Sequence, residues 1–480
     1  MKLKELLHGV PVTECHADLE QKIGSVAYDS RKVQPGGLFV AISGFASDGN
    51  RFIPMAMEKG AVVIVTAKKP EQEIPYVLVS SDRLALSLIA ANWFDHPAEK
   101  MTCIGITGTN GKTSSTLLLK HVLEVTKGAK VGLIGTMENQ IGDEIIPTER
   151  TTPESYELQE LFSRMVQAGC QYMVMEVSSH AIALDRVGGV QYEVAAFTNL
   201  TEDHLDFHKT MEAYCDTKAE LFRRCRIGVL NRDDPWFDRM IANATCTVKT
   251  TSEQADGDLR AENIRLFSDK VCFTAVSGEE SAEVTLSIPG KFTVYNALTV
   301  LGVSMALGIP LKDAADALAT AEGVKGRVEV VPTPGKPYTV LIDYAHTPDG
   351  LENVLSSVRG FCKGRLIAVF GCGGDRDPMK RPIMGEIGVR LSDIAIITSD
   401  NPRTEEPMKI IEDILAGVKG DNYEVICDRR EAIRHAMDIA CKDDIIVLAG
   451  KGHETYQEIN HVKHHLDERE EVARHLAEER

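Results

Sequence analysis

The sequence predicts an α/β protein of three domains, and three observations carry this prediction. Short apolar runs such as "AVVIVTA" and "RLIAVF" alternate with segments of helical periodicity along the chain, a pattern typical of sheets covered by helices. The 480 residues exceed what one domain usually holds, which is roughly 100 to 200 residues. Breaks occur at "DHPAEKM" and at the Gly- and Pro-rich "AEGVKGRVEVVPTPGKP". We therefore predict domains over residues 1–98, 99–328 and 329–480.

The elements of each domain follow from the same alternation. In the first, we expect strands at "SVAYDS", "LFVAI", "AVVIVTA" and "YVLVSS", and helices at "NRFIPMAMEKG" and "DRLALSLIAANWF". In the second, "TCIGITGTNGKTSSTLLLKHVLEVT" indicates a strand, a glycine-rich turn and a helix, followed by strands at "YMVMEVS", "VAAFTNL" and "RIGVLN" and a helix at "TVYNALTVLGVSMALG".

The third domain repeats strand and helix, in a pattern close to a dinucleotide-binding fold. Strands are expected within "TVLIDYAHT", "RLIAVFGCGGDRD", "IAIITSDNPR" and "DIIVLAGKG", and helices at "LENVLSSVRGF" and "KIIEDILAGV". The charged end, "DEREEVARHLAEER", indicates a solvated amphipathic helix.

Composition argues against several classes of protein. The formal charge of −18, with no evident cluster of Lys and Arg, disfavours nucleic-acid binding. No run of about 18 apolar residues occurs, and "MKLKELLHGV" is too polar for a signal peptide, so we expect a cytoplasmic protein without a membrane anchor. Eleven cysteines, never spaced Cys-x-x-Cys, fit reduced thiols better than a disulfide framework or a zinc site.

The segment "GITGTNGKTSS" is typical of a phosphate-binding loop between a strand and a helix. Glycines let backbone N–H groups face phosphate oxygens, a lysine adds a point charge, and a threonine hydroxyl can bind Mg²⁺. Ile106 stands where the strict G-x-x-x-x-G-K-[ST] pattern has its first glycine. The residues that we expect to contact ATP are Gly108, Thr109, Asn110, Gly111, Lys112, Thr113 and Ser114.

Ten segments, read together and in order, resemble the Mur ligases over essentially the whole chain. They are "GITGTNGKT", "MEVSSHAIALDRV", "FTNLTEDHLDFH", "YCDTKAELF", "YNAL", "GR", "DYAHTPDGLENVL", "GDRD", "DNPR" and "GKGHE". The resemblance implies a UDP-substrate domain, a central P-loop-like ATPase domain and a C-terminal Rossmann-like domain that receives an amino acid. It also implies a monomer in which ATP phosphorylates a carboxylate and an amine attacks the acyl phosphate.

The resemblance implies that Mg²⁺ assists this reaction, because two anions, the carboxylate and the γ-phosphoryl group, must approach each other. Lys218 matches a lysine that the family carries as a carbamate. An ammonium cannot bind a metal, but a neutral amine can take up CO₂ and become an anion. The implied metal ligands are Thr113, Glu176, His204 and Lys218, and the implied catalytic residues are Lys112, His204 and Lys218.

Further positions match family contacts to the other substrates. For ATP these are Asn296, Arg327 and Asp343, with His346 nearby and Thr293 departing from a common asparagine. For UDP-N-acetylmuramoyl-L-alanyl-D-glutamate they are Ser30, the "GFASDG" loop, Thr151, Thr152, Ser178 and Arg186. Arg150 stands where relatives often have asparagine, and Asn50 stands where they have histidine.

The loop "DNPR" predicts which amino acid is added. The implied substrate is meso-2,6-diaminopimelate, joined to the γ-carboxylate of D-glutamate. Its far end carries a carboxylate and an ammonium that L-lysine lacks as a pair, and a planar guanidinium can bind such a carboxylate bidentately. Arg403 matches the residue that does this in the family. The other expected substrate residues are Arg376, Asp400, Asn401, Pro402, Gly450 and Glu454.

Other interpretations of these motifs remain open. "NPR" could be a turn whose proline fixes φ while the arginine faces solvent. The chain could add L-lysine, or it could be a folylpolyglutamate synthase, although the N-terminal "DSR" domain disfavours the latter. It could also be a nucleotide-binding protein that has lost the chemistry.

Overall fold

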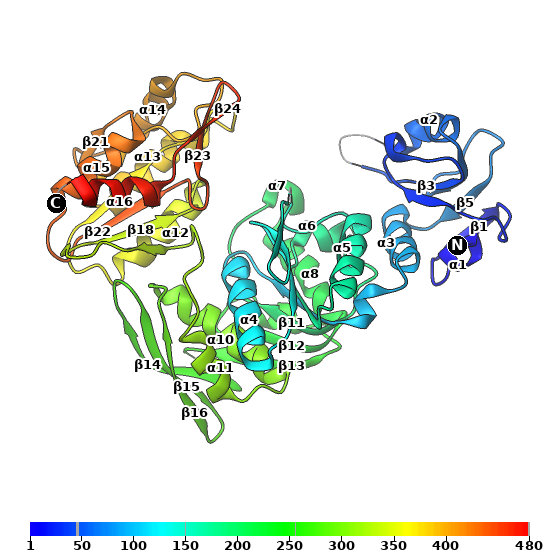
Figure 1. Ribbon diagram of the computed structural model, residues 1–480, viewed down its shortest axis with the longest axis horizontal. Helices are drawn as coiled ribbons and strands as arrows, with labels where there is room; N and C mark the ends of the chain where they lie inside the picture. The colour runs from blue at the N-terminus through cyan, green and yellow to red at the C-terminus, as the bar shows by residue number, and fades with distance from the viewer. Residues whose placement is uncertain (45–47, 149, 255, 479–480) are drawn as a thin grey trace. The chain divides into compact units, whose positions relative to one another are not determined.

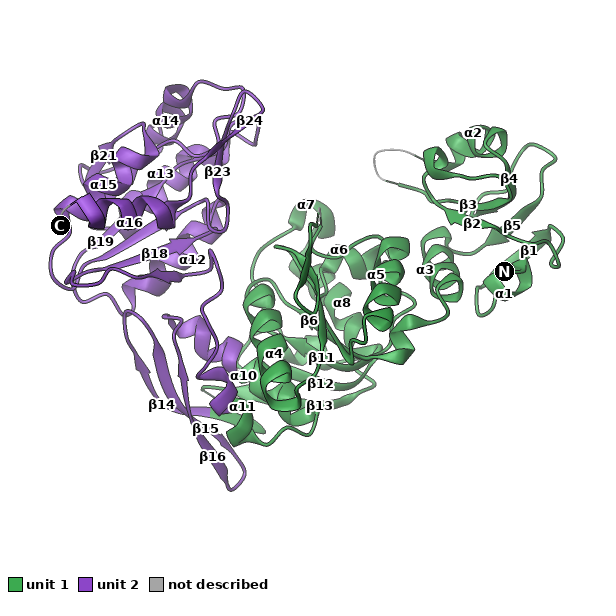
Figure 2. Ribbon diagram, viewed as in Figure 1, with its two compact units in different colours: residues 1–260, 298–314 green, residues 261–297, 315–480 purple. Residues whose placement is uncertain are grey.

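The computed structural model describes residues 1–44, 48–148, 150–254 and 256–478, and its α/β architecture confirms the predicted class (Figure 1). The chain divides into two compact units, residues 1–260 with 298–314 and residues 261–297 with 315–480 (Figure 2). The finer boundaries at 98/99 and 328/329 stay predictions.

A five-stranded sheet in the first unit has the order β1-β5-β4-β3-β2. Strands β2 to β5 are parallel and lie at the four segments predicted as strands, whereas β1 pairs antiparallel with β5. Every residue of β3 is buried, as expected for a parallel strand covered on both faces. The elements are α1 (Leu3–Leu6), β1 (Val12–His16), β2 (Ser25–Ala27), β3 (Gly37–Ala41), α2 (Ile53–Glu58), β4 (Ala61–Thr66), β5 (Tyr76–Val79) and α3 (Asp82–Trp93).

A larger sheet of the first unit carries the glycine-rich loop. This sheet has eleven strands in the order β16-β15-β14-β13-β12-β11-β6-β10-β7-β8-β9, and those from β13 to β7 are parallel. The carboxyl ends of β6, β10 and β11 therefore meet at one edge, where α/β proteins bind ligands. The strands are β6 (Thr102–Thr107), β7 (Val131–Ile134), β8 (Asn139–Ile141), β9 (Glu144–Ile146), β10 (Tyr172–Glu176), β11 (Tyr192–Phe197), β12 (Cys225–Asn231) and β13 (Thr247–Ser252).

Helices connect these strands, and their apolar faces form part of the core. Leu118, Leu119 and Val122 are buried along the helix that follows the glycine-rich turn. The helices are α4 (Lys112–Lys127), α5 (Ser155–Gln167), α6 (Ser179–Ala183), α7 (Leu205–His208), α8 (Met211–Ala219) and α9 (Phe237–Ile241). Three elements run from one unit into the other: β14 (Leu259–Leu266), α10 (Lys291–Ala306) and α11 (Leu311–Leu318).

The second unit contains a six-stranded sheet of order β17-β18-β22-β19-β20-β21, parallel except for β17. The unit also contains the hairpin β15–β16, which belongs to the eleven-stranded sheet, and the separate hairpin β23–β24. Its strands are β15 (Val271–Ser277), β16 (Glu280–Leu286), β17 (Glu329–Val331), β18 (Thr339–Asp343), β19 (Leu366–Phe370), β20 (Ile394–Ile397), β21 (Tyr423–Val425), β22 (Ile445–Ala449), β23 (Tyr456–Ile459) and β24 (Val462–His465). Its helices are α12 (Pro348–Arg359), α13 (Lys380–Leu391), α14 (Pro407–Leu415), α15 (Arg429–Ile439) and α16 (Glu468–Glu478).

The C-terminal helix is amphipathic, as predicted, with one solvated face, but its other face buries acidic residues. Glu468 and Arg429 are both completely buried, and the carboxylate accepts a hydrogen bond from the guanidinium at 2.8 Å. Glu471 and Val472 of α16 are also buried. A buried charge persists only when it is paired, so the arginine on α15 explains how an acidic helix docks here.

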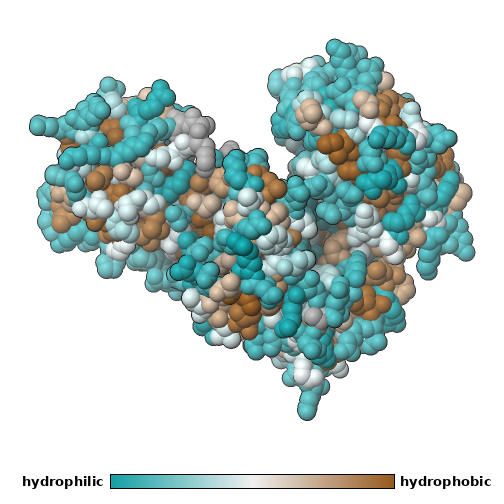
Figure 3. Space-filling model, turned by 180° about the vertical axis from the view of Figure 1, so that it is seen from behind, coloured by the Kyte–Doolittle hydropathy of each residue, from teal (hydrophilic) through white to brown (hydrophobic). Residues whose placement is uncertain are grey.

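The surface is largely hydrophilic (Figure 3), as the 26% of charged residues in the sequence would suggest. Hydrophilic residues cover most of the face shown in Figure 3, with hydrophobic residues in small groups. Within the described ranges, no helix has both the length and the apolar character needed to cross a membrane.

Candidate active site

The turn between β6 and α4 has the backbone geometry of a phosphate-binding loop. Gly108 has a φ of 146°, and a Cβ atom there would lie 2.0 Å from the Thr198 hydroxyl oxygen. Gly111, with a φ of 83°, directly precedes α4. Both conformations favour glycine, and the loop leads to a helix N-terminus, where anions bind. Ser114 lies half-buried in the first turn of this helix.

A segment that follows β11 holds this loop in place. The carbonyl of Asn199 accepts from the Thr109 N–H at 2.8 Å, and its Oδ1 accepts from the Asn110 N–H at 2.9 Å. The Thr198 hydroxyl donates to the Asn110 carbonyl at 2.6 Å. Asn199 is absent from the residues predicted above, although its place after a strand in "FTNLTEDH" was a usable signal.

Lys112 lies folded over the loop. Its Nζ donates to the carbonyl oxygens of Gly108 at 2.9 Å and Thr109 at 2.7 Å. A phosphate oxygen is a stronger acceptor for an ammonium than a carbonyl is, because the hydrogen bond then joins opposite charges. Lys112 is therefore placed to exchange these carbonyls for phosphate.

Two of the predicted metal ligands, Thr113 and Glu176, are in contact. The Thr113 hydroxyl donates to Glu176 Oε1 at 3.0 Å, and Glu176 is buried at the end of β10. Thr136, which was not predicted, donates to the same carboxylate through its N–H at 2.9 Å and its hydroxyl at 3.0 Å. Hydroxyl and carboxylate oxygens are hard donors that suit Mg²⁺, so this pair fits the ion.

The other two predicted ligands border a tyrosine. The His204 ring lies 6.2 Å from the Tyr214 ring, and Lys218 Nζ lies 4.7 Å from the Tyr214 ring centre. His204 also packs edge-on against His180, with ring centres 4.8 Å apart. Among the described residues, no three His, Cys, Asp or Glu side chains are grouped to hold a metal. The complete ligand set stays a prediction.

Lys218 is almost completely buried. Its Nζ donates to the Gly108 carbonyl at 2.9 Å and lies 3.5 Å from the Thr107 hydroxyl. Burial, and then the positive charge of Lys112, lower the pKa of Lys218 well below its ordinary value. Since a neutral amine is the form that adds CO₂, this environment meets the chemical requirement for the predicted carbamate.

The residues predicted to hold the dipeptide or its sugar meet beside Glu176. The Thr151 hydroxyl lies 3.0 Å from the hydroxyl of Thr136, which donates to the Glu176 carboxylate. The Thr152 hydroxyl donates to the Glu176 carbonyl at 2.8 Å and lies 3.3 Å from the Ser178 hydroxyl. Arg186 Nη1 donates to the Thr152 carbonyl at 3.2 Å. The structure thus brings all four together.

Three arginines surround one buried carboxylate next to these residues. Glu154 Oε2 lies 3.4 Å from Arg186, 3.6 Å from Arg83 and 3.7 Å from Arg150. Burial is the main cause that lowers the pKa of Arg186. Positive charge is in excess in this cluster, which suits an anionic part of a substrate. Arg83 and Glu154 were not predicted.

Ser30 lies in a 3₁₀ turn, where its hydroxyl donates to the Met55 sulfur at 3.4 Å. Asn50, where relatives have histidine, accepts from the Thr66 hydroxyl at 2.6 Å, which is a loop-packing role. Residues 45–47 of the predicted "GFASDG" loop lie outside the described residues.

Predicted nucleotide residues of the second unit lie near the end of β18. Asp343 accepts from the N–H groups of Val328 and Ala345, each at 2.8 Å, and burial raises the pKa of its carboxyl. The Arg327 guanidinium lies 5.4 Å from the Tyr344 ring centre. Asp343 therefore holds the backbone beside this arginine.

Of the remaining nucleotide positions, Asn296 and Thr293 are buried, whereas His346 is exposed. Asn296 is buried in α10. The Thr293 hydroxyl donates to the Pro289 carbonyl at 3.2 Å, which occupies it within its own chain segment. His346 Nδ1 lies 2.8 Å from the Tyr344 carbonyl oxygen.

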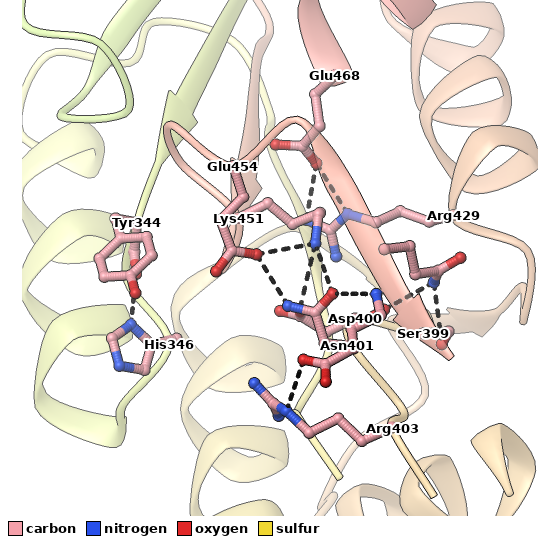
Figure 4. Close-up of polar contacts among 12 residues, drawn as sticks. Tyr344, His346, Ser399, Asp400, Asn401, Arg403, Arg429, Lys451, Glu454 and Glu468 are labelled. Atoms are coloured by element: carbon pink, nitrogen blue, oxygen red, sulfur yellow. Dashed lines mark hydrogen bonds and ion pairs between the residues drawn. The ribbon is translucent and has the colours of Figure 1, made fainter. Parts of the chain in front are cut away.

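The loop after β20 places its polar residues in a buried network (Figure 4). Asn401 Nδ2 donates to Glu454 at 2.8 Å, and its Oδ1 accepts from the Lys451 ammonium at 3.0 Å. Lys451 is completely buried, donates to Glu454 at 3.1 Å and lies 3.7 Å from Asp400. The carboxylates of Asp400 and Glu454 thus face the single ammonium of Lys451. The remaining negative charge can attract a second ammonium, from a ligand. Lys451 was not predicted, although it lies within "GKGHE".

Arg403 lies at the edge of this network in the left-handed backbone region, with a φ of 49°. Its Nε donates to Glu458 at 3.1 Å and its Nη1 donates to the Gly374 carbonyl at 2.8 Å. The guanidinium is therefore held from two sides. A Cβ atom on Gly374 would lie 2.0 Å from the Pro402 carbonyl oxygen, so these two loops fit together only with glycine there.

The last two predicted substrate residues differ in their surroundings. Gly450 has a φ of 115°, and a Cβ atom there would lie 2.5 Å from Asp400 Oδ2. Arg376 is exposed and donates to the Asp375 carbonyl at 3.0 Å. Gly450 is thus part of the network, and Arg376 is not bonded to it among the described residues.

Comparison with known proteins places the chain in a family. Sequence profiles match over residues 22–92 (Mur ligase family, catalytic domain), 106–304 (Mur ligase middle domain) and 326–452 (Mur ligase, glutamate ligase domain). A relative from Clostridium acetobutylicum, UDP-N-acetylmuramoyl-L-alanyl-D-glutamate–2,6-diaminopimelate ligase 1, is 49% identical over 100% of both chains. This chain belongs to the Mur ligase family.

Other comparisons agree with this assignment. A ligase from Clostridium botulinum named for the same substrates is 49% identical to this Mur ligase, over 94% of this chain and 95% of its own. A solved structure of a UDP-N-acetylmuramoyl-L-alanyl-D-glutamate–2,6-diaminopimelate ligase matches with a TM-score of 0.76 and 30% identity, over 100% of this chain and 99% of the other. The predicted three-domain Mur ligase fold is confirmed.

Proposed function

We propose that this Mur ligase uses ATP to join 2,6-diaminopimelate to UDP-N-acetylmuramoyl-L-alanyl-D-glutamate, a step in peptidoglycan precursor synthesis. The observation that carries this proposal is the 49% identity, over essentially the whole length, to relatives named for these substrates. The meso isomer and the γ-carboxylate of D-glutamate, both expected from the motifs, are part of the same proposal.

The reaction that we propose has two steps. A substrate carboxylate attacks the γ-phosphorus of ATP and ADP leaves, which turns a poor leaving group, oxide, into phosphate. The amine of the amino acid then attacks the acyl carbon, an amide forms, the amine loses a proton and phosphate departs. The first step brings two anions together, so cationic groups at the phosphoryl group lower its barrier.

The phosphate loop supports the first step. Lys112 offers an ammonium beside the loop carbonyls, and the loop backbone leads to the N-terminus of α4. Thr113 and Glu176 would hold Mg²⁺, together with His204 and Lys218 as its carbamate. When bound, this ion neutralises charge on the phosphates. Carbamate formation from the buried neutral amine and CO₂ releases one proton.

The DNPR loop supports the choice of amino acid. Arg403 offers a guanidinium to the far carboxylate of diaminopimelate, while Asp400 and Glu454 accept from its ammonium. Asn401 Oδ1 already accepts from Lys451 and from the Glu458 N–H, at 3.0 and 2.9 Å, so it contributes by orienting these groups.

The test is phosphate release from ATP, with each of the three substrates omitted in turn. We expect release only when ATP, the UDP-linked dipeptide and diaminopimelate are all present. Mass spectrometry should detect one molecule of ligated product for each phosphate released. Phosphate release without product, or no release with all three, would contradict the proposal.

A further inference from the structure

The β23–β24 hairpin clamps the DNPR loop through its backbone. The Arg403 N–H donates to the Glu458 carbonyl at 3.0 Å, and the Asn460 N–H donates to the Arg403 carbonyl at 2.7 Å. Gln457 Nε2 donates to the Asp400 carbonyl at 2.7 Å. This hairpin begins after residue 452, where the match to the family's glutamate ligase domain ends.

Within this hairpin, the side chain of Glu458 contacts the guanidinium of Arg403. Glu458 Oε2 accepts from Arg403 Nε at 3.1 Å, and both side chains are about four-fifths buried, with 21% and 17% of their surfaces exposed. The Gly374 carbonyl accepts from Nη1 at 2.8 Å. In the part of the chain that the structure describes, Nη2 donates no hydrogen bond. The end of the guanidinium fork is thus left for a ligand.

We propose that Glu458 is a positioning residue that orients the Arg403 guanidinium so that Nη1 and Nη2 together face the far carboxylate of the amino-acid substrate. This inference rests on the proposed function, because it concerns the same diaminopimelate site. Glu458 itself touches no substrate.

The physical argument is one of preorganisation. An arginine side chain has several rotatable bonds, and fixing them at the moment of binding lowers affinity. An acceptor on Nε and a second on Nη1 fix the plane of the guanidinium before the substrate arrives. A carboxylate next to the arginine also cancels part of its attraction for an anion, so orientation must outweigh this charge effect for Glu458 to aid binding.

The left-handed backbone of Arg403 explains why a clamp is needed. This conformation is strained for a residue that has a side chain. The two backbone hydrogen bonds to the hairpin and the Glu458 ion pair hold it there. Glu458 therefore fixes the side chain of a residue whose backbone the same hairpin already holds.

A double-mutant cycle tests this inference in the full-length enzyme. We expect Glu458→Ala to raise KM for diaminopimelate about tenfold, and to leave KM for ATP and for the UDP-linked dipeptide within about twofold. Glu458→Gln should have a smaller effect, because its carboxamide oxygen still accepts from Nε. In an Arg403→Ala background, Glu458→Ala should change KM for diaminopimelate no further.

The matched control is Glu470→Ala, which removes an exposed glutamate of the same unit that pairs with His465. It should leave all three KM values unchanged. The inference is overturned if Glu458→Ala leaves KM for diaminopimelate unchanged, or if it adds the same loss in the Arg403→Ala background. Absence of diaminopimelate-dependent phosphate release in the wild type would instead contradict the proposed function.

Discussion

Arg403 combines three features that rarely meet in a surface turn. It has a left-handed backbone without being glycine, its side chain is mostly buried, and its guanidinium is bonded at Nε and Nη1. A turn whose arginine simply faced solvent would lack the burial and the hydrogen bonds of the guanidinium. Strained backbone held by its surroundings is typical of ligand-binding positions.

Replacing Arg403 with alanine should therefore affect one substrate. We expect KM for diaminopimelate to rise about 10- to 100-fold, since a hydrogen bond to a charged group contributes roughly 1.5–3 kcal/mol. KM for ATP and for the UDP-linked dipeptide should stay within about twofold. Steady-state phosphate release, with each substrate varied in turn, measures this. Equal increases in all three constants would indicate that the residue acts through the fold.

Replacing Lys218 with methionine should abolish most of the activity and leave the protein folded. Lys218→Met removes an amine but keeps a buried chain of similar length, so the protein should fold. Its activity should fall by roughly 100-fold or more, the scale on which single groups at developing charge act. Retained activity would exclude the proposed carbamate.

The pH dependence of stability follows from the lowered pKa of Lys218. The unfolded chain holds this proton up to its ordinary pKa of 10.5, whereas the folded protein releases it at lower pH. Between the two pKa values the unfolded state binds more protons, so wild-type stability rises with pH. The Lys218→Met variant lacks this titrating amine, so it lacks this contribution to stability. In CO₂-free buffer, the melting temperature of the wild type should gain on that of the variant as pH is raised, and a constant difference would show that the lysine pKa is ordinary.

At the scale of elements, the loops that follow parallel strands carry the residues of the proposed amino-acid site. The motifs "DNPR" and "GKGHE" follow β20 and β22, two buried strands whose carboxyl ends lie at the same edge of the sheet. The glycines of these loops make room for neighbouring polar groups. Gly450 is the clearest case, because its Cβ position is filled by a carboxylate oxygen.

Gly450→Ala should consequently impair both folding and amino-acid binding. Added atoms would displace Asp400, so we expect KM for diaminopimelate to rise about tenfold. Gly9→Ala is the matched control, since Gly9 also has a positive φ, of 71°, but no atom within 4 Å of its Cβ position. Both variants place a side chain at a positive φ, which costs of order 1–3 kcal/mol. Urea denaturation should show a larger loss for Gly450→Ala, and equal losses would mean that crowding there is harmless.

The sequence predicts buried parallel strands well, because they form continuous apolar runs. It predicts the β23–β24 hairpin poorly. That hairpin has charged, partly exposed residues such as Glu458 and Lys463, so no alternation of apolar residues marks it. The burial of Glu468 was missed for a related reason, since an acidic helix docks only because Arg429 lies opposite.

At the scale of the whole molecule, motif order identifies the family, but contacts between distant segments do not follow from motifs. Lys112, Thr113 and Arg403 could be predicted because each lies in a short pattern with a chemical meaning. Thr136 and Glu458 could not, because their roles arise from strands and loops that meet only in the folded chain.

The proposal that the whole molecule is a diaminopimelate-adding ligase is tested most directly by comparing two amino acids. Phosphate release from ATP and UDP-N-acetylmuramoyl-L-alanyl-D-glutamate would be followed with diaminopimelate and with L-lysine, side by side, using the wild-type enzyme. We predict release with diaminopimelate and none above background with L-lysine, because L-lysine has no far carboxylate for Arg403. Release that depends on L-lysine alone would contradict this account.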